Sequence, residues 1–370
     1  MEFELSEDRE LFLAATRKFL AAEVPVAVVR ALEHEPAGFA ADLWRQGAQL
    51  GWTSLLVPEA DGGGSVGEHG LLDLVLVAEE MGRRVAPGPL SPVNLVASAV
   101  AAGGSPAQKE TVLPGLLAGE AVAAWTGPGL VDAEADAAGD GYTLTGVAAP
   151  VEAGAQARHL LVGARTPDGP TLLLVGPDVA GVTVTPLGGL DLVRRYAEVR
   201  FEGARLPASA VVGTAGGAAH EVERLWQTAC VLQCAETVGA IDHVFEMTLE
   251  YLGDRYSFGR PLSSYQALKH RVADDRMWLE ACHAVSTAAA RAVATGAGDA
   301  AELVGAAKAW IGPHATELVQ DCIQLHGGIG VTWEHDLHLY LRRATVNRLT
   351  YGTPEEHAER IASRVLGEAS

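Results

Sequence analysis

The sequence predicts an α+β fold in which a central antiparallel β domain lies between two helical domains. Residues 1–118 carry apolar side chains at helical spacing, and residues 119–212 hold short β-rich runs separated by turn signals. Residues 213–370 return to long helical patterns. The chain has 370 residues and 48% hydrophobic content, so it can bury a large core within this three-domain organisation.

Two helices of the N-terminal domain have clear boundary signals. Ser6 precedes the run EDRELFLAATRKFLAAE and is a favourable N-cap residue. The run LLDLVLVAEEMGRR has an apolar stripe and ends at Arg83 and Arg84, where positive charge complements the helix dipole. Between them, PEADGGGSVGEHG is too rich in glycine to be helical, so we expect a loop there.

The central domain contains five runs typical of strands. They are YTLTG, HLLVGA, TLLLVG, GVTVTPL and YAEVRF. Turn signals separate them, among them Gly139-Asp140-Gly141 and Pro167-Asp168-Gly169. This pattern predicts a small antiparallel sheet, closed as a barrel or packed as a sandwich.

The C-terminal domain is expected to hold four helical segments. One long pattern covers EVERLWQTACVLQCAETVGAIDHVFEMTLEYLGDR, a second begins near Ser263 and a third near Asp299. The last follows RLTYGTPEEH, in which Thr353, Pro354 and Glu356 match a capping box with proline at the first helical position. The two acids after the proline therefore have a structural explanation as helix-start residues.

Composition excludes several classes of function. The formal net charge is −20, which argues against nucleic acid or an anionic membrane as the main partner. The N-terminal MEFELSEDRE is acidic where a signal peptide would be basic, and no apolar run reaches the length that spans a membrane. We therefore expect a cytoplasmic protein.

No metal site is predicted. The four cysteines match no disulfide or zinc pattern, and Cys230 and Cys234 are expected to be buried apolar residues. His326, His335 and His338 do not fall on one helical face, because a glycine-rich break interrupts the segment that carries them.

The segment DRYSFGRPLSSYQALKHRVADD has features that suit an anionic ligand with a flat ring. Arg255 offers a forked donor to phosphate oxygens, Phe258 can stack on a ring, and the Gln266 amide can both donate and accept. The alternative is a helix end followed by a turn that Gly259 and Pro261 fix, with a solvated arginine. Alone, the segment favours that alternative.

A second candidate segment is CIQLHGGIGVTWEHDLHLYLRR. Gly327, Gly328 and Gly330 let a ligand approach the backbone and leave N–H groups free for phosphate oxygens. Gln324, one turn earlier, can bond a ribose or an adenine edge. A plain C-cap would explain a single glycine but is less satisfactory for three. The segment is not a Rossmann fingerprint, because a helix rather than a strand precedes the glycines.

Together these segments resemble the acyl-CoA dehydrogenase family over nearly the whole chain. The resemblance rests on YLGDRYSFGRPLSSYQALKHRVADD, on QLHGGIGVTWEHDLHLYLRRA, on VPEADGGGSVGEHG and on the helix–sheet–helix order. It implies a C-terminal four-helix domain, assembly as dimers or dimers of dimers, and FAD as cofactor. The implied reaction removes two hydrogens from the α and β carbons of an acyl-CoA thioester.

The resemblance also implies cofactor-binding residues. Arg255, Phe258 and Gln266 match positions that bind the FAD of a neighbouring subunit, and Thr353 matches a threonine beside the flavin's own phosphates. The strip that holds the ADP portion of the neighbour's FAD corresponds to Gln324, Leu325, His326, Gly327 and Gly328.

The chain departs from the family at the catalytic base. Tyr351 stands where many members carry the glutamate that abstracts the α-proton, and Ala229 stands at the position that another branch uses. A phenol with a reference pKa near ~10 is a poor base at neutral pH, and alanine cannot accept a proton. No catalytic residue is therefore assigned. The flavin-facing segments WTGPGLVDAEAD and GVAAPVEAG have also lost the family's acid, aromatic and threonine, although Thr126 and Pro128 remain.

Retained groups thus serve a neighbour's FAD, while lost groups would serve the chain's own. This favours the base-lacking subunit of an α₂β₂ acyl-CoA dehydrogenase, in which a sister subunit supplies the base. By family analogy the substrate is a bulky acyl-CoA, including those with steroid side chains, and the electron acceptor is an electron-transfer flavoprotein. Two alternatives stay open. One is a self-sufficient homotetramer with a relocated base at Glu236, Glu355 or Glu356. The other is a non-catalytic scaffold of the same fold.

Overall fold

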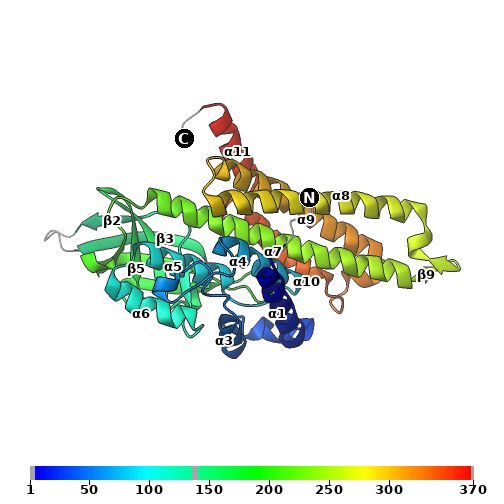
Figure 1. The fold of residues 1–370 in the computed structure, drawn as a ribbon, viewed down its shortest axis with the longest axis horizontal. Helices are drawn as coiled ribbons and strands as arrows, with labels where there is room; N and C mark the ends of the chain where they lie inside the picture. Colours follow the sequence, from blue (N-terminus) through cyan, green and yellow to red (C-terminus); the bar gives the residue numbers. More distant parts are fainter. Residues whose placement is uncertain (1–4, 136–140, 368–370) are drawn as a thin grey trace.

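The computed structural model describes residues 5–135 and 141–367, so the predicted turn residues Gly139 and Asp140 lie outside it. Ser6 caps the first helix as expected, because its side chain accepts a hydrogen bond from the Arg9 backbone N–H at 3.4 Å. The N-terminal helices are α1 (Glu7–Glu23), α2 (Val26–Ala31), α3 (Ala41–Gln49), α4 (Gly70–Arg83), α5 (Leu90–Gly103) and α6 (Pro106–Leu117) (Figure 1).

The central domain is one mixed sheet. Its strands are β1 (Ala123–Trp125), β2 (Val131–Ala135), β3 (Gly141–Glu152), β4 (His159–Thr166), β5 (Gly169–Val175), β6 (Val182–Leu187), β7 (Tyr196–Pro207) and β8 (Val211–Val212). They pair in the order β6-β7-β3-β2-β4-β5-β8, with β1 added beside β4. All five predicted strands are present. The sheet is not purely antiparallel, because β1 and β2 both run parallel to β4.

The C-terminal part contains the four predicted helical segments and one more helix. The helices are α7 (Ala219–Asp254), α8 (Gln266–Thr295), α9 (Ala300–His326), α10 (Leu337–Leu349) and α11 (Pro354–Val365). Helix α8 begins three residues after Ser263, because a short 3₁₀ turn occupies Leu262–Ser264. A small hairpin, β9 (Tyr256–Ser257) and β10 (Arg260–Pro261), joins α7 to α8. No helix of the described residues is both long and apolar enough to cross a membrane.

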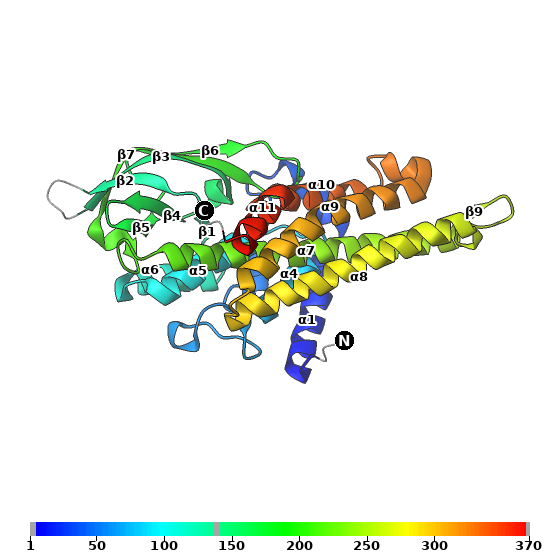
Figure 2. The same ribbon diagram turned by 90° about the horizontal axis from the view of Figure 1, so that it is seen from above.

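The long helices separate the sheet from this hairpin. In both ribbon views the sheet lies at one end of the molecule, and the β9–β10 hairpin projects from the other (Figures 1 and 2). Helix α7 runs between the two ends and packs against α4, α8 and α9.

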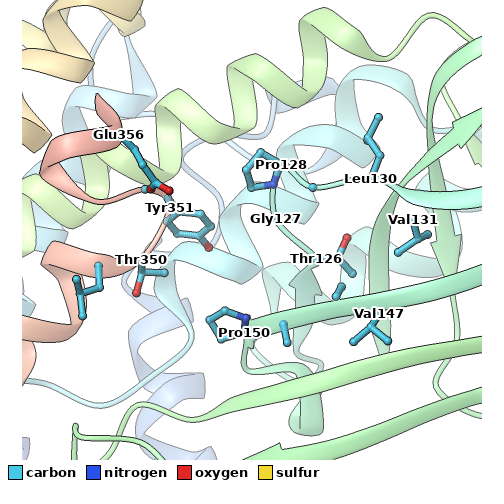
Figure 3. Close-up of a pocket in the computed structure, with 15 residues that line it drawn as sticks. Thr126, Gly127, Pro128, Leu130, Val131, Val147, Pro150, Thr350, Tyr351 and Glu356 are labelled. Carbon is cyan, nitrogen blue, oxygen red and sulfur yellow. The ribbon is translucent and has the colours of Figure 1, made fainter. Parts of the chain in front are cut away.

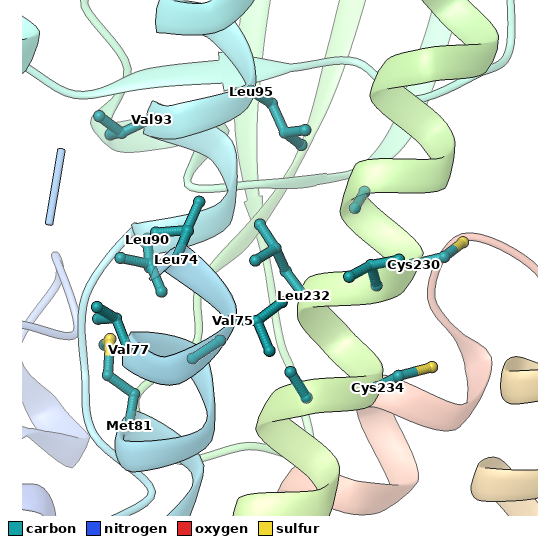
Figure 4. Packing of buried hydrophobic residues seen from close by; sticks show 14 of the residues in the cluster. Leu74, Val75, Val77, Met81, Leu90, Val93, Leu95, Cys230, Leu232 and Cys234 are labelled. Carbon is teal, nitrogen blue, oxygen red and sulfur yellow. The ribbon is translucent and has the colours of Figure 1, made fainter. Parts of the chain in front are cut away.

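One hydrophobic core joins the N-terminal helices to the C-terminal ones. Leu74, Val77 and Met81 of α4 are buried in the same cluster as Leu232 of α7 (Figure 4). Cys230 and Cys234 are buried and unpaired, as expected for apolar core residues.

The crossing of α4 and α7 depends on two glycines. A Cβ at Gly239 would lie 1.9 Å from the Glu79 carbonyl oxygen, and one at Gly82 would lie 1.9 Å from the Glu236 carbonyl oxygen. Each helix therefore contacts the backbone of the other directly, and neither site has room for a methyl group.

We expect Gly239→Ala to destabilise the chain by about 1–3 kcal/mol, because the two helices must separate to admit the methyl group. Gly253→Ala is the matched control. It lies in the same helix with no atom within 4 Å of its Cβ position, so the change should be neutral or stabilising. Urea unfolding of both variants measures the difference. Equal free energies of unfolding would contradict the close crossing.

Candidate functional site

A cavity of about 540 Å³ lies between the β domain and the loop that joins α10 to α11. Figure 3 shows the Tyr351 ring directed from this loop toward Thr126 and Pro150. The lining residues are Thr126, Gly127, Pro128, Gly129, Leu130, Val131, Val147, Ala148, Ala149, Pro150, Leu349, Thr350, Tyr351, Gly352 and Glu356. Most of the lining side chains are apolar, and none is cationic, so this cavity suits a flat or acyl group better than a phosphate.

The Tyr351 ring is packed rather than poised for chemistry. The ring stacks on Trp125 with the ring centroids 6.0 Å apart. The backbone carbonyl of Tyr351 accepts a hydrogen bond from the Trp226 indole N–H at 2.9 Å. These contacts hold a left-handed backbone at Tyr351, with φ of 61°, which is unusual for a residue with a side chain. Burial raises the pKa of the phenol well above its ordinary value, so it does not act as a base near neutral pH.

The other family position offers no base either. Ala229 lies in α7 at 0% exposure, within the hydrophobic core. Both positions from which a base is expected therefore lack a group that can accept the α-proton.

The acids at the start of α11 are accounted for by helix capping. The Glu356 carboxylate accepts a hydrogen bond from the Thr353 N–H at 2.8 Å, and the Thr353 hydroxyl accepts one from the Glu356 N–H at 3.2 Å. This confirms the predicted capping box. Glu355 has a side chain that is 75% exposed, with Arg348 3.9 Å away.

Glu236 is held by two arginines in the interior. Its Oε1 lies 2.6 Å from Arg194 Nη2 and 2.7 Å from Arg343 Nη1, and its Oε2 accepts from Asn347 at 2.8 Å. Burial would raise the pKa of this carboxyl, but the charges of Arg194 and then Arg343 hold it below its ordinary value. Glu236 is thus a buried, paired anion rather than a free base.

The same network connects the β domain to α7 and α10. Arg343 also binds Asp191, which accepts hydrogen bonds from the backbone N–H groups of Val193 and Arg194 at 2.9 Å each. Arg194 lies 3.4 Å from Glu152 at the end of β3. Two elements of the β domain and two helices are therefore locked together by paired charges.

Lys308 fixes the loop that carries Tyr351. This lysine is 3% exposed, and its ammonium donates to the carbonyls of Asn347 at 2.6 Å and Thr350 at 2.8 Å, and to Gln233 Oε1 at 3.1 Å. Burial lowers the pKa of the amine. A cation at the last carbonyls of α10 is favourably placed against the helix dipole.

Replacing Lys308 by Met should destabilise the chain by about 2 kcal/mol, because three acceptors lose their donor. Lys109→Met is the control, since Lys109 is paired with Asp61 at a part-exposed site far from this loop. Thermal unfolding compares the two. A larger loss for Lys109→Met would contradict the assigned role.

The residues predicted to bind a nucleotide lie at the other end of α7. Arg255 follows the last residue of this helix and is exposed, and Phe258 at the hairpin tip is 97% exposed. Gln266 begins α8 close behind the hairpin. The guanidinium and the ring thus face solvent, away from the chain's own cavity.

The glycine strip lies at this same end. The rings of His326 and Tyr251 stack at 4.4 Å, and the Tyr251 hydroxyl donates to the His326 carbonyl at 3.1 Å. This contact joins the end of α9 to α7 one turn before Arg255. A Cβ at Gly327 or Gly328 would meet no atom within 4 Å, so the backbone there is open to a ligand.

The structure therefore divides the nine predicted cofactor residues into two sets. Eight lie at the hairpin end, which we call the distal end: Arg255, Phe258, Gln266, Gln324, Leu325, His326, Gly327 and Gly328. Thr353 lies beside the cavity, next to Gly352. Trp226 and Asp254 are 28 positions apart in α7, which separates the Tyr351 loop from the hairpin by about 40 Å.

The three histidines do not converge on a metal position. His326 and His335 meet edge to face at 4.8 Å, while His338 stacks on Trp333 at 4.5 Å. Within residues 5–135 and 141–367, no group of three or more His, Cys, Asp or Glu side chains is arranged to hold a metal ion.

Comparison with known proteins identifies the fold. Residues 6–120 match the family model "Acyl-CoA dehydrogenase, N-terminal domain", and residues 222–366 match "Acyl-CoA dehydrogenase, C-terminal domain". Acyl-CoA dehydrogenase IpdE2 of Mycobacterium tuberculosis is 31% identical, over 97% of this chain and 98% of that protein. The chain belongs to the acyl-CoA dehydrogenase family. Its members are oxidoreductases that act on CH–CH bonds, and the predicted three-part fold is confirmed.

Two solved structures are similar to this chain over almost its whole length. The ChsE4–ChsE5 complex of Mycobacterium tuberculosis superposes with a TM-score of 0.89 at 27% identity, over 100% of both chains. A variant of the steroid acyl-CoA dehydrogenase Tcur3481–Tcur3483 gives 0.87 at 29% identity, over 99% of this chain and 100% of that one.

FAD is the cofactor of the acyl-CoA dehydrogenase family. The residues at the distal end suit the cofactor better than the residues around the cavity do. The distal end offers an exposed guanidinium, a free aromatic ring and open glycine backbone, which suit phosphates and a base. Around the cavity, Pro128 and Pro150 have no N–H, and the Glu356 carboxylate already accepts from Thr353. These three residues therefore offer no side-chain or proline N–H donor to the polar edge of a flavin ring.

Proposed function

We propose that this chain is the base-lacking subunit of a mixed acyl-CoA dehydrogenase, most simply α₂β₂, and that it completes the ADP site of FAD held by a sister subunit. One observation carries the proposal. The cavity has no carboxylate free to abstract a proton, whereas the groups predicted to bind a nucleotide, most of them exposed, lie about 40 Å away at the distal end.

That separation assigns the two sets to different active sites. The distal groups cannot reach a ring in the chain's own cavity, because the rigid helix α7 holds them apart. Six of the eight are exposed and available to a second polypeptide, namely Arg255, Phe258, Gln266, Gln324, Gly327 and Gly328, whereas Leu325 and His326 are buried.

In this role the chain binds and orients, and it performs no proton transfer. Arg255 would hold phosphate oxygens of the FAD, Phe258 would pack on one of its rings, and the backbone N–H groups near Gly327 would donate to further phosphate oxygens. Bound FAD supplies the acceptor for the hydride from the β carbon. The sister subunit supplies the carboxylate that takes the α-proton.

The related complexes support both the partner and the substrate class. The ChsE4–ChsE5 structure is a complex of two named chains, and Tcur3481–Tcur3483 is described as a steroid enzyme. We therefore propose a bulky acyl-CoA thioester, such as one with a steroid side chain, as substrate. The proposed electron acceptor is an electron-transfer flavoprotein.

The decisive test compares the chain purified alone with the chain co-expressed with a related subunit that bears the glutamate, taken from the adjacent open reading frame. Alone, we expect little flavin absorbance and no acyl-CoA oxidation; together, both should be present. A yellow, active homo-oligomer would refute the proposal and favour a relocated base. A complex that binds acyl-CoA without any flavin would favour the scaffold alternative.

A matched pair of variants tests the distal end within that complex. Arg255→Ala should lower flavin content at least tenfold at limiting FAD, because a charge-assisted phosphate contact is lost. Arg260→Ala in the same hairpin is the control, since the Arg260 guanidinium lies over the Tyr265 ring at 3.9 Å. Equal flavin content in the two variants would argue against the assigned role of Arg255.

A further inference from the structure

A groove of about 580 Å³ lies between α8 and α9, separate from the cavity already described. In both ribbon views α8 runs along the outer edge of the helical bundle (Figures 1 and 2). The lining residues are Arg271, Asp274, Asp275, Met277, Trp278, Glu317, Gln320, Asp321 and Gln324. Four of these are acidic and one is basic.

The single basic residue among these lining residues, Arg271, already forms an ion pair. Arg271 Nε lies 3.1 Å from Asp321 Oδ2, and a second nitrogen of the same guanidinium contacts the other carboxylate oxygen. This pair bridges α8 and α9 and leaves the remaining acids of the groove without a cation from the lining.

Asp275 is the group that this arrangement leaves unsatisfied. The residue is 2% exposed, and its Oδ2 has no hydrogen-bond partner among the described residues. Burial raises the pKa of the carboxyl to about 6, with Arg271 opposing that shift and Asp274 adding to it. A buried carboxylate without a donor is costly, so a ligand that brings one gains an unusually favourable contact.

We propose that the α8–α9 groove is a docking surface for the sister subunit, which places an arginine or lysine side chain against Asp275. The inference rests on the proposed function and deepens it by naming the contact. The groove is negative, so its occupant is basic. The chain itself carries a net charge of −20, which disfavours a second copy.

Two further observations favour a protein over a free cation. Met277, which is 60% exposed, and the half-buried Trp278 both line the groove, so apolar surface adjoins its acidic residues. Gln324 lines the groove and also belongs to the distal set that is proposed to meet the sister's cofactor. One partner can therefore cover both surfaces continuously, and its cation would be desolvated on docking.

The test uses the complex co-expressed with the glutamate-bearing subunit and measures dissociation by sedimentation velocity over a dilution series. Asp275→Asn keeps the shape and removes the charge, and it should raise the dissociation constant at least tenfold. Asp274→Asn removes the same charge from the exposed neighbour and should change it less than threefold. Glu317→Gln, on the opposite wall, should give an intermediate loss, and it tests the groove independently of Asp275.

Thermal unfolding of the isolated chain separates docking from folding. Asp275→Asn should leave the midpoint unchanged or raised, because a costly buried charge has been removed. If this variant melts lower and Glu317→Gln assembles normally, Asp275 serves the fold and the inference fails. The inference also fails if the dissociation constant of the Asp275→Asn complex is within threefold of the wild-type value. It fails likewise if Asp275→Asn abolishes only the self-association of this chain.

Failure of the inference is distinguishable from failure of the proposed function. If the complex carries flavin and is active, but its dissociation constant is unchanged by Asp275→Asn, only the docking contact is overturned. A wild-type chain that forms no complex and oxidises acyl-CoA by itself overturns both.

Discussion

Replacing Tyr351 by Phe should leave turnover of the proposed complex within about threefold, whereas changing the catalytic glutamate proposed for the sister subunit to Gln should lower turnover by about 10²–10⁴-fold. The contrast follows from the state of the phenol. Burial raises its pKa, so the hydroxyl does not ionise at the working pH. Phenylalanine keeps the stacking on Trp125 that the loop requires.

Steady-state oxidation of an acyl-CoA by the complex, with an artificial electron acceptor, measures both changes. The unfolding midpoint of Tyr351→Phe provides the control for folding. Loss of more than a hundredfold in turnover with an unchanged midpoint would make Tyr351 part of the chemistry and contradict the assignment of the base to the sister chain.

The largest stability effect is expected at Arg343. This residue is 1% exposed and pairs with both Asp191 and Glu236. Replacement by Met leaves two buried carboxylates short of a counter-charge, so we expect a loss of about 3–5 kcal/mol. Arg342→Met is the matched control. Arg342 donates to the Leu190 carbonyl and lies over Trp333 near the surface, and its loss should cost about 1 kcal/mol.

The same substitution should change the acid sensitivity of the fold. The folded-state pKa values of Asp191 and Glu236 are depressed, so these groups stabilise the chain above their unfolded pKa near ~4 and lose that contribution as the pH falls. Arg343→Met removes part of the depression and should flatten the fall in stability below about pH 5. Urea unfolding at pH 7 and pH 4 measures it. A variant as acid-sensitive as the wild type would contradict the pairing.

Local sequence patterns predicted the helices and strands better than they predicted the contacts between them. Ser6 and the Thr353–Glu356 pair mark helix starts through side chains three residues apart, so the sequence contains the whole interaction. Strands β1 and β2 went unpredicted, because AAW is very short and VDAEA is acidic. Their parallel pairing with β4 comes from tertiary packing, which no local pattern encodes.

The candidate site shows the same division. The two empty base positions follow from the motif around Tyr351, but the stacking of Tyr351 on Trp125 joins residues in different domains. Sequence reasoning also missed Lys308. The sequence did contain an indication, because a single lysine in the apolar run AELVGAAKAWIGP is expected to be buried and to need hydrogen-bond acceptors. What the pattern could not give was the identity of those acceptors.

If the proposed assembly is correct, the length of α7 also determines how many flavins are productive. In the proposed assembly, the distal end of this chain completes the FAD site of a sister subunit. The corresponding end of the sister subunit lies over a cavity in which the Glu356 carboxylate is held in a helix cap. Equal numbers of the two chains then hold one productive flavin per pair. Titrating bleachable flavin against protein mass would count half as many working centres as polypeptides.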